Sequence, residues 1–295
     1  MPGPRGIPLS GLDDPRLDDY RHVADHDQLV RRGVFVAEGR LVVERLLAQR
    51  RHRTRSVLLS ATAADAIAPA LRDADADIPV FIVPQADMNA VVGFNIHRGC
   101  LAIAERPERV TVDALDLSTC RRLLVVEGVT NPDNVGGLFR NAEALGVSAV
   151  VLGPNCGDPL YRKAVRTSLA AVLSLPWADA GPWPDALLRI RAAGLQIVAC
   201  TPSPGATSLY DAVLPHRAAV LVGAEGPGLT PDALAHADLR VRIPMHGATD
   251  SLNVATAAAV VLSALAAHGA RRRETDGYGS SAQASDRVTA FRQPL

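Results

Sequence analysis

The feature that most constrains the fold is an alternation, between residues 122 and 267, of short apolar runs with segments of helical period. Most of these runs have several apolar residues in succession, so both faces of each strand must be covered. Such strands, alternating with helices, are typical of a mostly parallel α/β sheet with helices on both sides. The runs are LLVVEG, SAVVLG, LQIVAC, AAVLVG and LRVRIP, and helices are expected at about residues 135–145, 162–171, 185–193 and 252–267, with a short one after Thr230.

A smaller α/β unit precedes this region. Residues 39–50 have the apolar spacing of one helix face, and strand-like runs follow at 56–59, 78–84 and 99–105, with a short helix near 86–92. A chain of 295 residues is long enough for two domains. We expect a loosely packed lead-in at 1–30, the smaller α/β domain at 31–107, a linker at 108–120, the larger α/β domain at 121–270 and a disordered tail at 271–295.

Composition excludes several classes of function. Because 31 basic residues balance 31 acidic ones, nucleic-acid binding has to rest on local patches. The sequence has no apolar run of membrane-spanning length, and its start, MPGPRGIPLSG, lacks the apolar stretch of a secretory signal, so we expect a cytoplasmic protein without membrane contact. The cysteines form no CxxC pair and the histidines form no ligand cluster, so we expect neither a metal site nor a disulfide framework.

Three loops of the larger domain follow apolar strands, at the sheet edge where parallel α/β folds bind their ligands. In the first, EGVTNPDNVGGLFRNAEALG, Asn134 can cap the helix that carries Arg140. Gly136 and Gly137 allow close approach by a ligand or by another backbone. Read alone, this segment is equally a capped helix with a surface arginine.

The other two loops add an acidic residue and a small polar group to the same edge. In VGAEGPGLT, Glu225 lies among glycines whose backbone groups can face a polar ligand, although the same glycines also suit a simple turn. In RIPMHGATDSLNVATAAA, a strand ends at Ile243, and Ser251 is a natural N-cap for an alanine-rich helix. That helix can pack closely against a neighbour, or it simply consists of good helix formers.

In their order and spacing, NPDNVGGLFRNAEALG, GAEGPGLT and IPMHGATDSLNVATAAA resemble the three signature motifs of the SpoU class of SPOUT methyltransferases. The resemblance covers roughly residues 120–268 and implies methylation of a ribose 2′-hydroxyl in RNA with S-adenosylmethionine as cofactor. It also implies a trefoil knot in the sheet, a rare exception to unknotted chains, and a homodimer formed through the C-terminal domain. The stretch from VFVAEGRLVVERLLAQ to RGCLAIAERP resembles the ribosomal-protein-like substrate-binding domain of many members, which implies RNA binding by residues 31–107.

The resemblance also implies a role for each motif residue. It places Arg140 at the reacting hydroxyl, and since a guanidinium is effectively always protonated, we assign it first to stabilising the developing alkoxide and second to accepting the proton. Ala170 stands where the family usually has glycine, a change that removes no polar group. The residues that hold the arginine, the RNA or the cofactor in register are Asn134, Glu225, Ser251 and Asn253, and the cofactor contacts, chiefly through backbone atoms, fall on Thr201, Gly223, Ile243 and Leu252.

Two basic clusters are candidates for RNA contact. Clusters of this kind neutralise phosphates, but a solvated helix end has the same appearance. The few aromatic residues leave little scope for base stacking, so we expect recognition of RNA backbone and shape, and we assign Trp177 and Trp183 to packing. The first cluster is Arg50, Arg51, Arg53 and Arg55 at the end of the first strong helix, and the second is Arg162, Lys163 and Arg166 beside the expected active site.

The leading interpretation is an RNA 2′-O-ribose methyltransferase. Ribosomal RNA is favoured over tRNA as the substrate, because the N-terminal domain resembles that of members acting on ribosomal RNA. A tRNA 2′-O-methyltransferase and a noncatalytic RNA-binding ribosome-assembly factor stay open as alternatives. An oxidoreductase with a dinucleotide in the glycine loops is disfavoured, because no GxGxxG with a following ribose-binding acid comes after a first strand.

Overall fold

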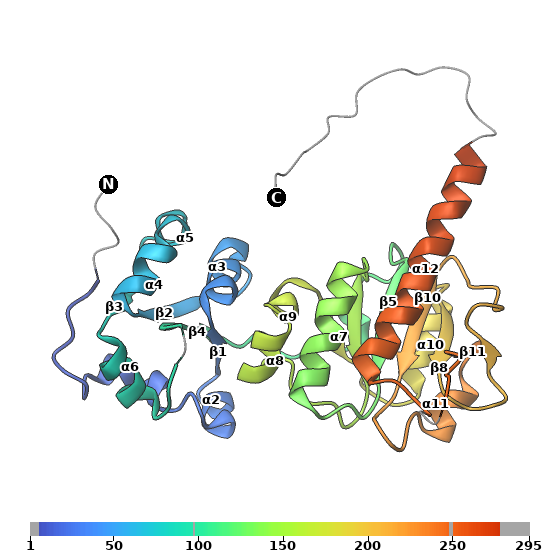
Figure 1. Ribbon diagram of the computed structural model, residues 1–295, viewed down its shortest axis with the longest axis horizontal. Helices are drawn as coiled ribbons and strands as arrows, with labels where there is room; N and C mark the ends of the chain where they lie inside the picture. The colour runs from blue at the N-terminus through green and yellow to red at the C-terminus, as the bar shows by residue number, and fades with distance from the viewer. Residues whose placement is uncertain (1–5, 97, 248–249, 278–295) are drawn as a thin grey trace.

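The computed structural model describes residues 6–96, 98–247 and 250–277, which form two sheets lying side by side (Figure 1). The N-terminal sheet has the strand order β1-β4-β2-β3, and the C-terminal sheet has the order β7-β6-β5-β10-β8-β11-β9. In this part of the chain, no helix has both the length and the apolar character needed to cross a membrane.

The N-terminal sheet is mixed. β4 lies between β1 and β2 and runs antiparallel to both, while β3 pairs with β2 in parallel. The strands are β1 (Val34–Glu38), β2 (Thr54–Leu59), β3 (Val80–Ile82) and β4 (Cys100–Glu105). The helices are η1 (Pro15–Leu17), α1 (Asp18–Arg21), α2 (His26–Arg31), α3 (Arg40–Gln49), α4 (Ala61–Ala66), α5 (Ala68–Asp73) and α6 (Gln85–Val92).

The segment before β1 is not loosely packed, so the prediction for 1–30 was wrong over the part that forms helices. Leu17, Tyr20 and Leu29 are buried against one face of the N-terminal sheet. The Tyr20 hydroxyl also lies 2.8 Å from Ser56 Oγ on β2. The error arose because these apolar residues are separated by many aspartates and arginines, which hide the helical period when helices are this short.

The C-terminal sheet is parallel at every described strand pair, which confirms the predicted fold class. β10 inserts between β5 and β8, so strands distant in sequence become neighbours. The strands are β5 (Arg122–Val126), β6 (Ala149–Leu152), β7 (Trp177–Asp179), β8 (Gln196–Cys200), β9 (Thr207–Ser208), β10 (Ala218–Val222) and β11 (Leu239–Arg242). The helices are η2 (Val112–Ala114), α7 (Pro132–Ala144), α8 (Arg162–Thr167), α9 (Ala171–Ser174), α10 (Asp185–Ala192), α11 (Pro231–Ala235) and α12 (Val254–Gly277). The trefoil knot and the domain boundaries stay predictions.

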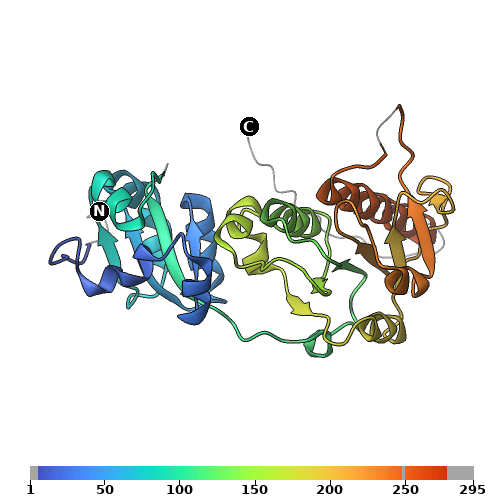
Figure 2. The same ribbon diagram turned by 90° about the horizontal axis from the view of Figure 1, so that it is seen from below.

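Alternate residues of the central strands enter two different cores. Leu124 and Val126 pack with α7 and α12, whereas Leu123 and Val125 pack with α10 and α11 on the opposite face. Figure 2 shows α12 and α7 on one side of the C-terminal sheet and α10 on the other. The fully apolar strands of the sequence are therefore explained by a sheet that is covered on both sides.

Two expected elements differ in extent. The helix expected over 162–171 is broken, because Leu169 and Ala170 adopt positive φ values of 51° and 70° between α8 and α9. The tail expected to be disordered from Arg271 is helical as far as Gly277, where α12 ends beyond the sheet (Figure 1). The rest of that predicted tail, residues 278–295, lies outside the described residues.

Candidate active site

A cavity of about 300 Å³ opens at the carboxyl ends of β8, β10 and β11, where α12 begins. Thr201 follows β8, Gly223 follows β10 and Ile243 follows β11, while Leu252 precedes α12. All four line this cavity. The structure thus brings together the residues to which the motifs assigned cofactor contact, although their roles stay predictions. Parallel strands end at one edge, so loops far apart in sequence meet there.

The glycine loop after β10 closes on itself at a narrow neck, and its residues 223–226, 228 and 229 line the cavity. A Cβ atom at Gly223 would lie 2.5 Å from the carbonyl carbon of Gly228 and from the amide nitrogen of Leu229. Gly228 itself has φ +72° and donates its N–H to the Ala224 carbonyl at 3.0 Å. The glycines therefore do more than make a turn, because a side chain at the neck would push the cavity wall apart.

Three of the predicted catalytic residues form one hydrogen-bonded group beside the cavity. Asn253 Nδ2 donates to Asn134 Oδ1 and to Glu225 Oε1, both at 2.8 Å. Ser251 lines the cavity as well, is exposed, and has no side-chain hydrogen bond among the residues that the structure describes. α7, the glycine loop and the start of α12 thus meet at Asn253.

Both predicted helix caps were assigned to the wrong residue. Asn253, not Ser251, caps α12, since its Oδ1 accepts from Ala255 N at 3.0 Å. Likewise Asn131, not Asn134, caps α7 and accepts from Asp133 N at 2.9 Å. Serine and asparagine are comparable caps, so the sequence alone did not decide between neighbouring candidates.

Arg140 lies outside the cavity on an exposed part of α7, and its side chain makes no ion pair or hydrogen bond among the described residues. The two glycines before it serve helix packing. A Cβ on Gly136 would lie 2.7 Å from the Ala164 carbonyl oxygen of α8, and one on Gly137 would lie 3.0 Å from Ala255 Cβ of α12. Both glycines therefore allow close approach by another helix, and Arg140 has no hydrogen bond to the Asn253 group.

Sequence reasoning did not single out Cys200, which ends β8 and also lines the cavity. Burial raises the pKa of its thiol to about 11, so the thiol stays protonated at neutral pH and is a poor nucleophile. The available signal was its position next to Thr201 at the end of the LQIVAC strand. A strand-end residue beside a predicted site residue is a good candidate for the lining.

The basic cluster predicted on α8 is occupied by ion pairs. Arg162 and Arg166 both donate to the carboxylate of Glu38, at 2.5 and 3.0 Å. Lys163 Nζ lies 2.7 Å from Asp133 Oδ2 at the start of α7. Because Glu38 ends β1 in the other sheet, the two arginines tie the domains together. RNA contact by this cluster stays a prediction.

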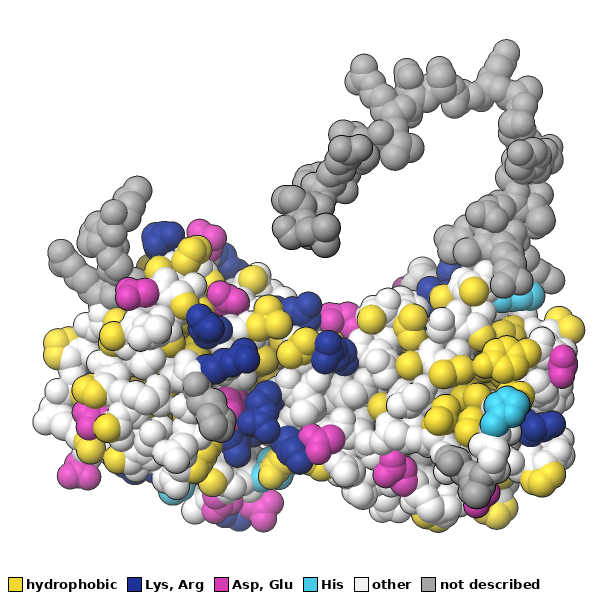
Figure 3. All heavy atoms as spheres, in the orientation of Figure 1, with side chains coloured by type: hydrophobic (Ala, Val, Ile, Leu, Met, Phe, Trp, Pro, Cys, Tyr) yellow, Lys and Arg dark blue, Asp and Glu magenta, His cyan; other side chains and the backbone are white. Residues whose placement is uncertain are grey.

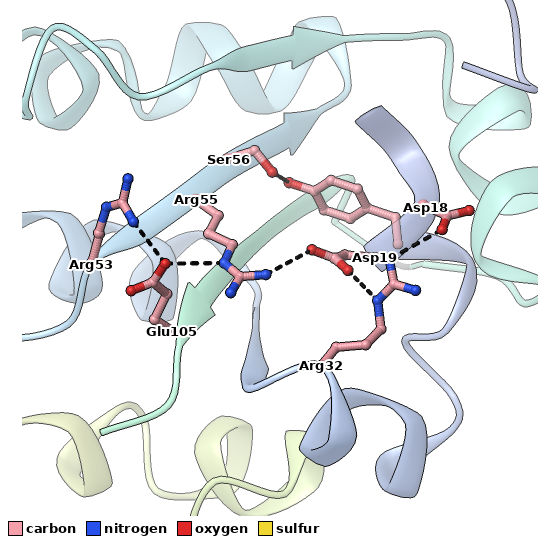
Figure 4. A network of polar contacts seen from close by, with 8 residues as sticks. Asp18, Asp19, Arg32, Arg53, Arg55, Ser56 and Glu105 are labelled. Atoms are coloured by element: carbon pink, nitrogen blue, oxygen red, sulfur yellow. Dashed lines mark hydrogen bonds and ion pairs between the residues drawn. The ribbon is translucent and has the colours of Figure 1, made fainter. Parts of the chain in front are cut away.

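Half of the N-terminal cluster is paired where β2 begins and β4 ends, in the middle of the smaller sheet. Arg53 and Arg55 share the Glu105 carboxylate at 2.9 and 3.2 Å, and Arg55 also lies 3.7 Å from Asp19 (Figure 4). Arg32 continues the network by donating to Asp19 at 2.6 Å. Figure 3 shows Lys and Arg side chains gathered over and beside the domain junction on this face. Much of that positive charge is thus matched by nearby carboxylates.

The other half of the cluster reaches toward neighbouring backbone. Arg51 donates to the Ser174 carbonyl oxygen at 2.8 Å, across the domain junction, and Arg50 donates to the Asp73 carbonyl oxygen and also lies 3.6 Å from the Asp75 carboxylate. Between them and Arg53, His52 is buried with its ring edge-on to Phe35. Burial lowers the pKa of His52, so this residue stays neutral near pH 7 and adds no charge to the cluster.

Comparison with known proteins gives these features a family context. The model of the SpoU rRNA methylase family matches residues 121–263. An uncharacterized tRNA/rRNA methyltransferase of Mycobacterium tuberculosis (strain ATCC 25618 / H37Rv) is 43% identical over 257 residues, covering 84% of this chain and 87% of its own. The 23S rRNA (guanosine-2′-O-)-methyltransferase RlmB of Neisseria meningitidis serogroup B is 30% identical over 193 residues, covering 64% and 77%. The SpoU methyltransferase AviRb from Streptomyces viridochromogenes, in complex with the cofactor AdoMet, has a TM-score of 0.71 at 24% identity over 89% of this chain and 100% of that one, a likeness of fold.

Proposed function

The chain belongs to the SpoU rRNA methylase family of RNA methyltransferases, and from that premise we propose that it methylates a ribose 2′-hydroxyl in ribosomal RNA. The family and its cofactor, S-adenosylmethionine, were both predicted from the sequence motifs and are confirmed. One observation carries the proposal. Four residues from separate loops, each expected to contact the cofactor, line a single cavity beside the Asn253 group.

The lining of the cavity fits S-adenosylmethionine. Val222, Leu229 and Ile243 offer apolar surface for an adenine ring. At the neck of the loop, Gly223 lies so close to Gly228 and Leu229 that no side chain fits between them. Thr201 and Leu252 complete the wall from β8 and the start of α12. Bound there, the cofactor would supply an electrophilic methyl group on a sulfonium.

The reaction forms an O–CH₃ bond at the ribose, breaks an S–CH₃ bond and releases the hydroxyl proton. Alignment of the two reacting atoms supplies much of the rate, so the rigidity of the Asn253 group matters. Glu225 uses Oε1 for Asn253, which leaves its other oxygen as a proton acceptor. We assign to Arg140 the stabilisation of negative charge on the ribose oxygen.

We further propose that the chain works as a homodimer through its C-terminal domain. Arg140 does not line the cavity of its own chain, so RNA or a second subunit has to complete the arrangement. Tyr210 and Val213 are 72% and 82% exposed on this domain, an apolar surface that suits a subunit contact. Sedimentation equilibrium should give twice the chain mass, and a monomer at micromolar concentration would contradict this assignment.

The preference for ribosomal RNA is supported by the relatives. RlmB is named as a 23S rRNA 2′-O-methyltransferase, whereas the mycobacterial relative is named for tRNA or rRNA. tRNA therefore remains the alternative substrate. We propose the cytoplasm as the site of the reaction, because both kinds of RNA are present there.

The deciding experiment is transfer of labelled methyl from S-adenosylmethionine to total RNA of a strain that lacks this gene. RNA from the parent strain is the control, because its target is already methylated. We expect label only in the deficient RNA, recovered as a 2′-O-methyl nucleoside of ribosomal RNA. Label in tRNA would select the alternative substrate, and no label in free RNA or ribosomal particles would contradict catalysis and favour a noncatalytic assembly factor.

A further inference from the structure

A buried carboxylate outside the cavity is attached to both ends of its glycine loop. Glu127 directly follows β5, is 3% exposed and does not line the cavity. Its backbone N–H donates to the Val222 carbonyl oxygen at 2.9 Å, one residue before Gly223. Glu127 is thereby fixed to the upstream end of the loop.

The side chain of Glu127 holds the downstream end. Thr230 donates its backbone N–H to Oε2 at 2.9 Å and its hydroxyl to Oε1 at 2.7 Å. The indole N–H of Trp183 donates to the same Oε1 at 2.8 Å. Neutral donors thus satisfy this buried carboxylate, and an unmet bond at such a site is costly.

The geometry also sets the direction of each hydrogen bond at Thr230. The Thr230 hydroxyl donates to Oε1, so its proton points toward Glu127. The same hydroxyl oxygen accepts from Ala233 N at 3.2 Å and caps α11. Thr230 is therefore oriented by Glu127 on one side and by the helix on the other, directly after Leu229 of the cavity wall.

We propose that Glu127 is a positioning residue for cofactor binding. It holds both ends of the glycine loop, at Val222 and at Thr230, and thereby fixes the cavity wall at Gly223 and Leu229. Trp183, assigned from the sequence to packing, shares this task through its indole N–H. The inference rests on the proposed function only for the identity of the cofactor.

The test is S-adenosylmethionine binding by isothermal titration to the full chain, with steady-state KM and kcat on the RNA substrate. Glu127→Gln keeps the size of the side chain but turns an NH₂ group toward a donor. We expect it to weaken S-adenosylmethionine binding about tenfold, with a matching rise in KM and kcat within about twofold. Thr230→Val should weaken binding in the same sense, Trp183→Phe less so, and Thr230→Ser should restore it because the hydroxyl returns.

Asp25→Ala is the matched control, since Asp25 caps α2 by accepting from Gln28 N at 2.9 Å, in the N-terminal domain. It should lower the melting temperature without changing cofactor affinity. Unchanged affinity in Glu127→Gln, or Thr230→Ser as weak as Thr230→Val, would overturn the positioning role. Should Glu127→Gln fail to fold, the two threonine variants decide. Failure of the proposed function looks different, because the unaltered chain itself would then bind no S-adenosylmethionine.

Discussion

At the cavity, polar side chains are held beside open space, whereas at the domain junction they are matched with one another. Asn253 is fixed by Asn134 and Glu225 next to the cavity, and Ser251 faces it without a described partner. At the junction, by contrast, a single carboxylate, Glu38, accepts from two arginines of the other domain. The cavity is arranged for a ligand, and the junction is arranged to fix two domains.

The comparison teaches that clustering of charge in sequence is weak evidence for a binding surface. Both predicted basic clusters consist of real surface arginines and a lysine, but carboxylates distant in sequence lie beside most of them. The net charge offered to RNA is therefore lower than the arginine count indicates. The glycine motifs were better evidence for a site. At Gly223 the loop leaves no room for a Cβ atom, and the same loop lines the cavity.

The largest expected effect is on the rate of methyl transfer when Arg140, which lies neither at the cavity nor at the domain junction, is replaced. Arg140→Ala should lower the single-turnover rate of methyl transfer by about 100-fold or more, because it removes charge stabilisation from the transition state. Binding of S-adenosylmethionine should be unchanged, since Arg140 does not line the cavity. The rate of Arg140→Lys should lie between those of the unaltered chain and Arg140→Ala. A lysine variant with full rate would count against a special role of the guanidinium. Weaker cofactor binding in Arg140→Ala would instead mean that Arg140 also contributes to the cofactor site.

The next effect tests the neck of the glycine loop. Gly223→Ala should weaken S-adenosylmethionine binding by about tenfold or more, because its Cβ meets backbone rather than a flexible side chain. Gly205→Ala is the matched control, since a Cβ there would have no atom within 4 Å. Isothermal titration of both variants makes the comparison, and equal affinities would mean that the loop yields freely.

Removal of the shared carboxylate tests the junction. Glu38→Gln should lower the free energy of unfolding by about 1–2 kcal/mol, because the partly buried Arg162 and the exposed Arg166 both lose the charge of their shared partner. Glu108→Gln changes the same charge at an exposed site and should leave stability unaltered. Urea denaturation measures both. A Glu38 variant as stable as the control would show that these two ion pairs do not stabilise the junction.

A smaller effect is expected where β2 begins and β4 ends in the N-terminal sheet. Glu105→Gln removes the carboxylate shared by Arg53 and Arg55, so RNA affinity at low salt should rise about two- to fivefold, with a steeper salt dependence. Filter binding of ribosomal RNA across a salt series measures this. An unchanged slope would remove these two arginines from the RNA interface.

The smallest effect concerns pH at the junction. Because burial lowers the pKa of His52, the unfolded chain binds its proton more tightly than the folded chain does. The free energy of unfolding should therefore fall as pH drops below the ordinary histidine value of about 6.5. His52→Gln should remove this part of the pH dependence in urea titrations. Identical pH profiles for the two chains would contradict a neutral, buried His52.

Much of the fold could be predicted because strand and helix periods are local properties. The apolar runs from LLVVEG to LRVRIP all became strands, and the order of the helices between them is as expected. The broken helix at Leu169 and Ala170 was not predicted, since alanine favours continuous helix and neither residue normally adopts a positive φ value. The short strands β7 and β9 were missed because two or three residues carry no period.

The candidate site likewise has features that the sequence predicted and features that it did not. Strand-end positions such as Thr201 and Gly223 follow from topology, so the motifs placed them at one cavity. Caps were misassigned by two or three residues, because Asn131, Ser251 and Asn253 are all competent and only the geometry of the loop selects one. Pairing of Arg162 with Glu38 spans 124 residues and has no local signal at all.

The break between α8 and α9 provides one of the contacts that link the two domains. Left-handed backbone at Leu169 and Ala170 costs about 1 kcal/mol or more at each residue, and it frees carbonyl groups that a continuous helix would use internally. The freed Leu169 carbonyl accepts from Arg45 of α3 at 3.0 Å. A sequence that restored an unbroken helix would withdraw this acceptor without altering any charge. Each domain would then keep its fold, but the angle between the two domains would be held less firmly.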